Sequence, residues 1–159
     1  MTGFLKHVDP IPSSIIDSRI VFVCKGNICR SALAHCYLNL LGYKNVSSFG
    51  LDTHPNKPAY KELVRSSAKE GVDLTIHRTS CISTYSPRST DLIICMEPYQ
   101  SKMIKRRYPN IKVTLLGLFL EKPIPYIHDP YGCSEPYLKK CTTTVMEAIK
   151  KMTLKLTLT

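Results

Sequence analysis

A short apolar strand that runs into a glycine-containing loop and then a helix is the feature that most constrains this chain. Residues 20–24 read Ile-Val-Phe-Val-Cys, a β-branched run typical of a fully buried strand. A turn signal follows at 25–27, and an apolar stripe at helical spacing begins a few residues later. This succession favours an anion site in an α/β fold, because N–H groups of the loop and of the helix N-terminus converge there.

The residues of this loop fit a phosphate group and a nucleophile. Arg30 can hold two phosphate oxygens in a bidentate fork, and the same positive charge favours the thiolate of Cys24. Ser31 can donate a hydrogen bond to that thiolate, Asn27 tolerates a left-handed backbone, and Gly26 permits close approach of the main chain. A buried core cysteine beside a surface arginine would leave the small and polar residues unexplained. We therefore interpret the loop as catalytic.

Residues 24–31, Cys-Lys-Gly-Asn-Ile-Cys-Arg-Ser, resemble the Cys-x5-Arg-Ser signature of the low-molecular-weight protein tyrosine phosphatases. Further stretches at 46–50, 91–97 and 129–131 fit that family in the same order. The resemblance covers nearly the whole chain from about residue 19. It implies an α/β fold, with a four-stranded parallel sheet, helices on both faces and a phosphate-binding loop after the first strand.

The pattern along the chain permits this fold. We expect strands over 20–24, 46–51, 91–96 and 112–116, and helices over 30–41, 59–70, 98–107 and 135–152. Strands that alternate with helices form parallel βαβ units, and such sheets bind ligands at the carboxyl ends of the strands. The loop after the fourth strand can therefore bring Asp129 to the Cys24 loop.

Asp129 is the candidate proton donor for the leaving oxygen and the later base for water. An Asp-Pro pair is commonly a plain turn, so it indicates a catalytic acid only in combination with the Cys24 loop. The phosphoryl group would pass to Cys24 and then to water. No metal or other cofactor is expected, because the loop and Arg30 supply the positive charge. Tyr131 would line the mouth, so phosphorylated proteins and small aryl phosphates are the expected substrates.

The resemblance also implies roles for residues around these three. It assigns phosphate binding to the rest of the loop, namely Lys25, Gly26, Asn27, Ile28, Cys29 and Ser31. Ser48 would hydrogen-bond the loop asparagine, and His77 would support the loop from behind, although a structural histidine is nearly as good an interpretation. Oxidation could join Cys29 to Cys24 in a reversible disulfide, or Cys29 could be a small packing residue.

Two departures from the family concern the aromatic wall of the mouth. Gly132 stands where many members place a second aromatic residue, and the loop at 52–56 lacks the aromatic often found there. The wall is therefore expected to be thin, which leaves the strength of a phosphotyrosine preference open.

Three alternatives remain. A protein arginine phosphatase on the same fold tends to carry threonine where this chain has Ile28. A thiol-coupled arsenate reductase needs a cysteine pair that Cys81 does not provide. A non-catalytic phosphate-binding module would have no use for both a nucleophile and an acid.

Chain length and net charge set the expectations for domain organisation and for partners. The 159 residues are enough for one domain, predicted over 19–159 and preceded by an extended or flexible leader at 1–18. A net charge of +10 attracts phosphorylated or acidic proteins, but no nucleic-acid motif accompanies it, so no specific nucleic acid is expected.

Compartment and assembly follow from other features of the sequence. The chain has no apolar run for a membrane span and no signal segment, and its seven cysteines favour reduced thiols in the cytoplasm. Residues 152–159 alternate with period two, which predicts a C-terminal strand that could mediate self-association.

Overall fold

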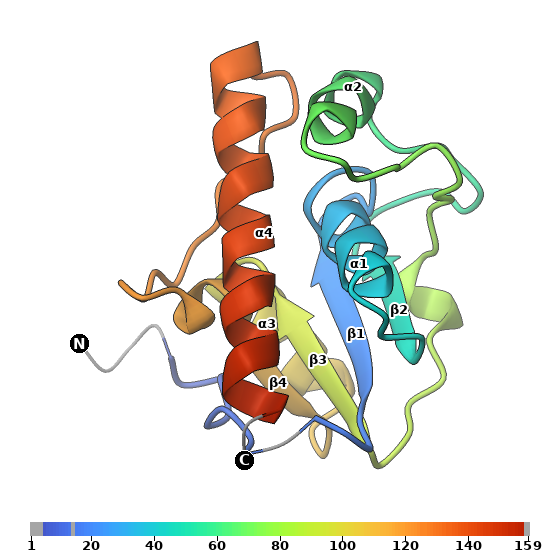
Figure 1. Cartoon of the computed structure of the whole chain (residues 1–159). Helices are drawn as coiled ribbons and strands as arrows, with labels where there is room; N and C mark the ends of the chain where they lie inside the picture. The colour runs from blue at the N-terminus through green and yellow to red at the C-terminus, as the bar shows by residue number, and fades with distance from the viewer. Residues whose placement is uncertain (1–4, 14, 158–159) are drawn as a thin grey trace.

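A computed structural model describes residues 5–13 and 15–157, which form a parallel sheet between layers of helices (Figure 1). The strands are β1 (Arg19–Cys24), β2 (Val46–Gly50), β3 (Asp91–Cys95) and β4 (Lys112–Leu115), in the order β2-β1-β3-β4. All three pairings are parallel, with β1 bonded on both sides. The central position of β1 places Cys24 in the middle of the carboxyl edge of the sheet. The predicted fold class is confirmed.

Helices cover both faces of this sheet. Helices α1 (Arg30–Leu40) and α4 (Glu135–Thr157) pack against one face, and α2 (Lys61–Lys69) packs against α4. Helix α3 (Pro98–Arg107) covers the other face together with the short 3-10 helix η1 (Ile82–Thr84), whereas the 3-10 helix η2 (Leu116–Phe119) packs against α4. No helix among the described residues is long and apolar enough to cross a membrane.

Alternate residues of the strands separate into the two apolar layers, because side chains of a strand point to opposite faces in turn. Phe22 and Ile94 belong to the layer under α1 and α4, whereas Val23 and Ile93 belong to the layer under α3. All four side chains are fully buried. Burial on both faces explains why these strands read as continuous apolar runs in the sequence.

The described part of the expected leader lies against the edge of the sheet. The N–H of Asp9 donates to the carbonyl of Val113 at 2.7 Å, and the N–H of Val113 donates to Oδ2 of Asp9 at 2.7 Å. The same carboxylate pairs with Lys105 of α3 at 2.7 Å, and Ile15 is buried. These contacts occupy backbone groups of the edge strand β4, which would otherwise be open to another chain. The domain boundary near residue 18 stays a prediction.

The predicted C-terminal strand is wrong for the described residues. Helix α4 continues to Thr157, five residues beyond the expected end at Met152. Met152 and Leu156 are both buried, while Leu154 between them is exposed. Residues four apart share one face of a helix, so a period of two over so short a stretch also fits a helical stripe. The helix removes the strand on which the predicted self-association depended; residues 158–159 lie outside the described chain.

Candidate active site

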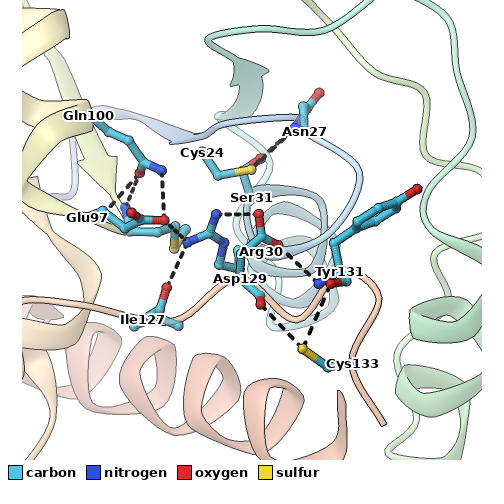
Figure 2. A network of polar contacts seen from close by, with 11 residues as sticks. Cys24, Asn27, Arg30, Ser31, Glu97, Gln100, Ile127, Asp129, Tyr131 and Cys133 are labelled. Atoms are coloured by element: carbon cyan, nitrogen blue, oxygen red, sulfur yellow. Dashed lines mark hydrogen bonds and ion pairs between the residues drawn. The ribbon is translucent and has the colours of Figure 1, made fainter. Parts of the chain in front are cut away.

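The loop between β1 and α1 wraps around the sulfur of Cys24. Cys24 is the last residue of β1 and is almost fully buried. The N–H of Asn27 donates to its Sγ at 3.3 Å, and Oγ of Ser31 lies 3.0 Å from the same sulfur (Figure 2). These two contacts fix the position of the sulfur, which is the candidate nucleophilic atom.

Asn27 holds the loop in shape from behind. It has a left-handed backbone, with φ of 53°, and its Nδ2 donates to Ser31 at 2.8 Å and to Ser48 at 3.0 Å. Its Oδ1 accepts from the N–H of Ser80 at 2.9 Å. Nε2 of His77 lies 2.7 Å from the carbonyl of Asn27, and because a carbonyl only accepts, Nε2 carries the proton. Every polar group of the Asn27 side chain is thus used in fixing the loop.

His35 extends this supporting network, and the sequence interpretation missed it. Its Nδ1 lies 3.0 Å from Oγ of Ser48, and its ring meets that of His77 edge-on at 6.5 Å. Burial, with a smaller contribution from His77, lowers the pKa of His35 to about 4. Burial also lowers the pKa of His77. The available signal was spacing, because His35 stands four residues after Ser31 and so shares its helix face.

Arg30, the first residue of α1, is fully buried and binds acceptors from separate segments (Figure 2). Its Nη1 donates to the carboxylate of Glu97 and to the carbonyl of Ile127, the latter at 2.8 Å. Its Nη2 lies 3.0 Å from Oδ2 of Asp129, while its Nε has no partner among the described residues. Burial opposes the charge, but Cys24, Glu97 and Asp129 together raise the pKa of Arg30.

Glu97 fixes the orientation of Arg30 and also begins a helix. It is the N-cap of α3, and a reciprocal capping pair with Gln100 is complete. Oε1 of Gln100 accepts from the N–H of Met96 at 2.9 Å and of Glu97 at 3.2 Å. The sequence interpretation gave Glu97 no role in the site, and the structure adds its contact with Arg30.

A hollow of about 200 Å³ opens above Cys24. The expected residues that the structure brings to its lining are Cys24, Lys25, Gly26, Ile28, Cys29, Asp129 and Tyr131. Asp52, which the sequence interpretation did not include, lines it as well. The side chains of Asn27, Ser31, Ser48 and His77 instead bind one another or the loop backbone, behind the sulfur. The Asp129 carboxylate is 43% exposed, so it stands at the rim.

The aromatic wall is thicker than the sequence predicts, because Tyr60 joins Tyr131. The two rings lie 4.7 Å apart with a tilt of 47°, and Tyr131 is 61% exposed at the mouth. The N–H of Tyr60 donates to the carbonyl of Ile28 at 2.8 Å, which ties the ring to the phosphate loop. Tyr60 immediately precedes α2, and no local pattern could have indicated that it reaches the mouth.

Two other cysteines lie close to the reactive centre. Cys29 is buried at the bottom of the loop, and burial raises the pKa of its thiol. Sγ of Cys133 lies 3.8 Å from the carbonyls of both Asp129 and Tyr131 and so contacts the loop that carries the candidate acid. All seven cysteines of the chain lie within the described residues and are free thiols.

Comparison with known proteins agrees with this arrangement. Residues 19–158 match the family described as low molecular weight phosphotyrosine protein phosphatase. The chain is 35% identical over 122 residues to a low molecular weight protein-tyrosine-phosphatase of Klebsiella pneumoniae, covering 74% of this chain and 83% of that protein. A protein of the same description from Escherichia coli K12, Etp, is 35% identical over 121 residues, with 73% and 79% covered.

Solved structures agree with the sequences. The crystal structure of the Erwinia amylovora tyrosine phosphatase amsI superimposes with a TM-score of 0.77 at 26% identity, covering 86% of this chain and 91% of that one. Residues 19–158, which match the family, include the four strands, the loop between β1 and α1, and the helices that follow. The chain belongs to the low molecular weight phosphotyrosine protein phosphatase family.

Proposed function

We propose that this chain hydrolyses phosphotyrosine and small aryl phosphates through a phosphate ester of Cys24. One observation carries the proposal: a cysteine held by hydrogen bonds of its loop and a carboxylate meet at one hollow, and a buried arginine bonds to that carboxylate. Cys24 and Asp129 line it, and Arg30 bonds directly to Asp129. A nucleophile, an anion clamp and a proton donor are the groups that phosphoryl transfer through a covalent intermediate needs.

Binding of the phosphate group comes first. Its oxygens accept from N–H groups of the loop 25–30 and from Arg30, whose Nε has no other partner in the described chain. The same oxygens compete with Asp129 for Nη2 of Arg30, because both are anions that seek the same donor. Release from Arg30 frees the Asp129 carboxyl, when protonated, to face the leaving oxygen.

Two displacements at phosphorus follow. Sγ of Cys24 forms a bond to phosphorus while the bond to the aryl oxygen breaks, and Asp129 gives its proton to that oxygen. Water then attacks the phosphocysteine, Asp129 takes a proton from the water, and the S–P bond breaks. Ser31 and the N–H of Asn27 stabilise the departing thiolate, since both lie within hydrogen-bond distance of the sulfur. Inorganic phosphate leaves, and the enzyme is restored.

The mouth of the hollow supports aromatic substrates. Tyr131 with Tyr60 behind it offers a ring face on which an aryl group can stack. Ile28 lines the hollow with an apolar side chain, where a protein arginine phosphatase tends to carry threonine. Phosphorylated proteins are the natural partners of such a site, and we place the chain in the cytoplasm, where its free thiols stay reduced. Oxidation that joins Cys24 to Cys29 stays a prediction.

Stopped-flow hydrolysis of p-nitrophenyl phosphate tests the proposal. The reduced native chain is expected to give a burst of nitrophenolate, and Cys24→Ser is expected to abolish both burst and turnover because the nucleophile is lost. Cys36→Ser is the matched control, since Cys36 is a half-buried cysteine of α1 outside the hollow, and it should keep the burst. Absence of turnover in the reduced native chain would overturn the proposed function.

A further inference from the structure

A second and larger hollow lies between α3 and the loop that precedes Asp129. Its volume is about 770 Å³, and four of its lining residues carry basic side chains: Lys6, His7, Lys102 and Arg106. Two prolines and two half-exposed tyrosines, Tyr99 and Tyr126, complete the lining, and no acidic residue contributes to it. Such a site fits an extended anionic ligand with some apolar surface.

Within the described residues, the basic side chains that α3 contributes to this hollow are unpaired, unlike two of their neighbours on the same helix. Lys105 of α3 bonds with Asp9, and Arg107 stacks over the ring of Tyr108. Lys102 and Arg106 are exposed and have no ion pair or hydrogen bond of their side chains within the described chain. They stand four residues apart, so they share a helix face that looks into the hollow. Basic residues in the last turn of a helix stabilise it by interacting with the helix dipole. Lys102 lies before the last turn of α3, so this effect does not account for its charge.

The walls of this hollow join the active site through the partners of Arg30. Tyr99 follows Glu97 by two residues, and Tyr126 immediately precedes Ile127, so each wall is adjacent to an acceptor of Arg30. The N–H of Ile127 also donates to the carbonyl of Met96 at 2.9 Å, which holds the two segments side by side. A chain bound in the hollow therefore contacts the two segments that hold Arg30.

We propose that this basic hollow, lined by Lys6, His7, Lys102, Arg106, Tyr99 and Tyr126, binds an acidic segment of the phosphorylated protein whose phosphotyrosine occupies the Cys24 site. The inference rests on the proposed function and specifies its substrate class. Carboxylates pair with Lys102 and, in a bidentate manner, with Arg106. The tyrosine rings pack against the peptide. A nucleic acid or a membrane surface is disfavoured, because the charges line one concavity instead of a long track or a flat face.

Two phosphotyrosine peptides of equal length test this inference, one with acidic residues on both sides of the phosphotyrosine and one with the matching amides. The native chain is expected to favour the acidic peptide by roughly fivefold or more in kcat/KM at low salt, with the preference falling as salt is added. The double variant Lys102→Glu/Arg106→Glu should lose the preference while turnover of p-nitrophenyl phosphate is unchanged. Lys150→Glu/Lys151→Glu, which makes the same charge change on an exposed part of α4, should retain it.

A direct binding measurement separates this inference from the proposed function. Fluorescence anisotropy of an acidic peptide without phosphotyrosine should show binding to the native chain that Lys102→Glu/Arg106→Glu abolishes, whether or not the chain is a phosphatase. If the charge reversals disturb folding, Lys102→Gln/Arg106→Gln takes their place. Equal turnover of the two phosphopeptides would overturn the inference. So would binding of a mixed-sequence oligonucleotide or of phosphatidylserine vesicles that depends on these residues while the acidic peptide does not bind.

Discussion

Strand β1 begins with one arginine ion pair and is followed, just past its carboxyl end, by another. At the amino end, Nε and Nη2 of Arg19 donate to the two oxygens of Asp91 at 2.8 and 2.6 Å. The same carboxylate accepts from the hydroxyl of Tyr85 and from the N–H of Arg88. Asp91 has no exposed side-chain surface. This pair joins β1 to β3 and leaves no place for a ligand.

At the carboxyl end, Arg30 is more deeply buried than Arg19, but one of its partners is open to solvent. Glu97 and Ile127 hold one nitrogen, while the partner of Nη2 is the half-exposed Asp129, and Nε has no partner in the described chain. The difference teaches that an arginine becomes a ligand site when one of its anionic partners can be exchanged. We expect the fixed pair to contribute to stability and, under the proposed function, the exchangeable pair to contribute to binding and catalysis.

Removal of the exchangeable carboxylate should have the largest effect on rate. Asp129→Ala is expected to lower kcat for substrates with poor leaving groups about 10²–10⁴-fold, because the leaving oxygen then lacks its proton donor. The free energy of unfolding should change by less than about 1 kcal/mol, since Asp129 is half-exposed and Glu97 and Ile127 still hold the buried Arg30. Steady-state kinetics over aryl phosphates of graded leaving-group pKa, with urea unfolding in parallel, measure both. A large decrease in the free energy of unfolding would contradict the view that the Arg30–Asp129 pair is exchangeable and contributes little to stability.

Removal of the fixed carboxylate should give the opposite result. Asp91→Ala is expected to lower the free energy of unfolding by about 3–5 kcal/mol, because Arg19 and Tyr85 lose their shared partner inside the fold. The value of kcat for the remaining folded protein should be unchanged. Urea unfolding and active-site titration measure the two quantities, and Asp17→Ala, at an exposed aspartate, is the control. A lower kcat in fully folded Asp91→Ala protein would contradict the assignment of this pair to stability alone.

Acid should lower the free energy of unfolding through different groups near the two ends of β1, and in different ranges of pH. His35 has a pKa of about 4 in the fold against 6.5 as its ordinary value, so the unfolded state binds more protons between these values. Stability from this source is complete above about pH 6.5 and is lost as the pH falls toward 4, by about 2–3 kcal/mol.

The pair at the amino end behaves differently. Burial raises the pKa of Asp91, but its hydrogen bonds with Arg19 and Tyr85 outweigh burial and lower it below 3.8, so this pair persists to lower pH. Urea unfolding from pH 7 to 4 should show a flatter pH dependence for His35→Gln than for the native chain. An equal pH dependence of the free energy of unfolding in the two proteins would exclude His35 as the source of the acid sensitivity.

The smallest expected effect concerns the tyrosines near the two ends of β1. Tyr85 is buried against Asp91, whereas Tyr60 stacks on the exposed ring of Tyr131. Tyr60→Ala should raise KM for phosphotyrosine peptides about three- to tenfold, the value of one aromatic contact, with a smaller effect on kcat. Tyr60→Phe keeps the ring and should behave as the native chain does. An unchanged KM in Tyr60→Ala would remove Tyr60 from the wall.

Local patterns predicted most of the fold. All four strands and all four longer helices lie where the apolar periodicity placed them, and α3 has the expected bounds. The error at the C-terminus arose because a few residues at period two fit a strand and a helical stripe equally well, and only packing of Met152 and Leu156 in the core decides between them.

The sequence by itself determined the chemistry of this protein, since Cys24, the loop after it and Arg30 are contiguous and their order on a strand, turn and helix fixes how they face an anion. Tertiary structure decided what surrounds them. Glu97 and Asp129 reach Arg30, and Tyr60 reaches Tyr131, from elements far along the chain. The physical reason is that periodicity and turn residues act over a few positions, whereas contacts between distant segments depend on how whole helices and loops pack on the sheet.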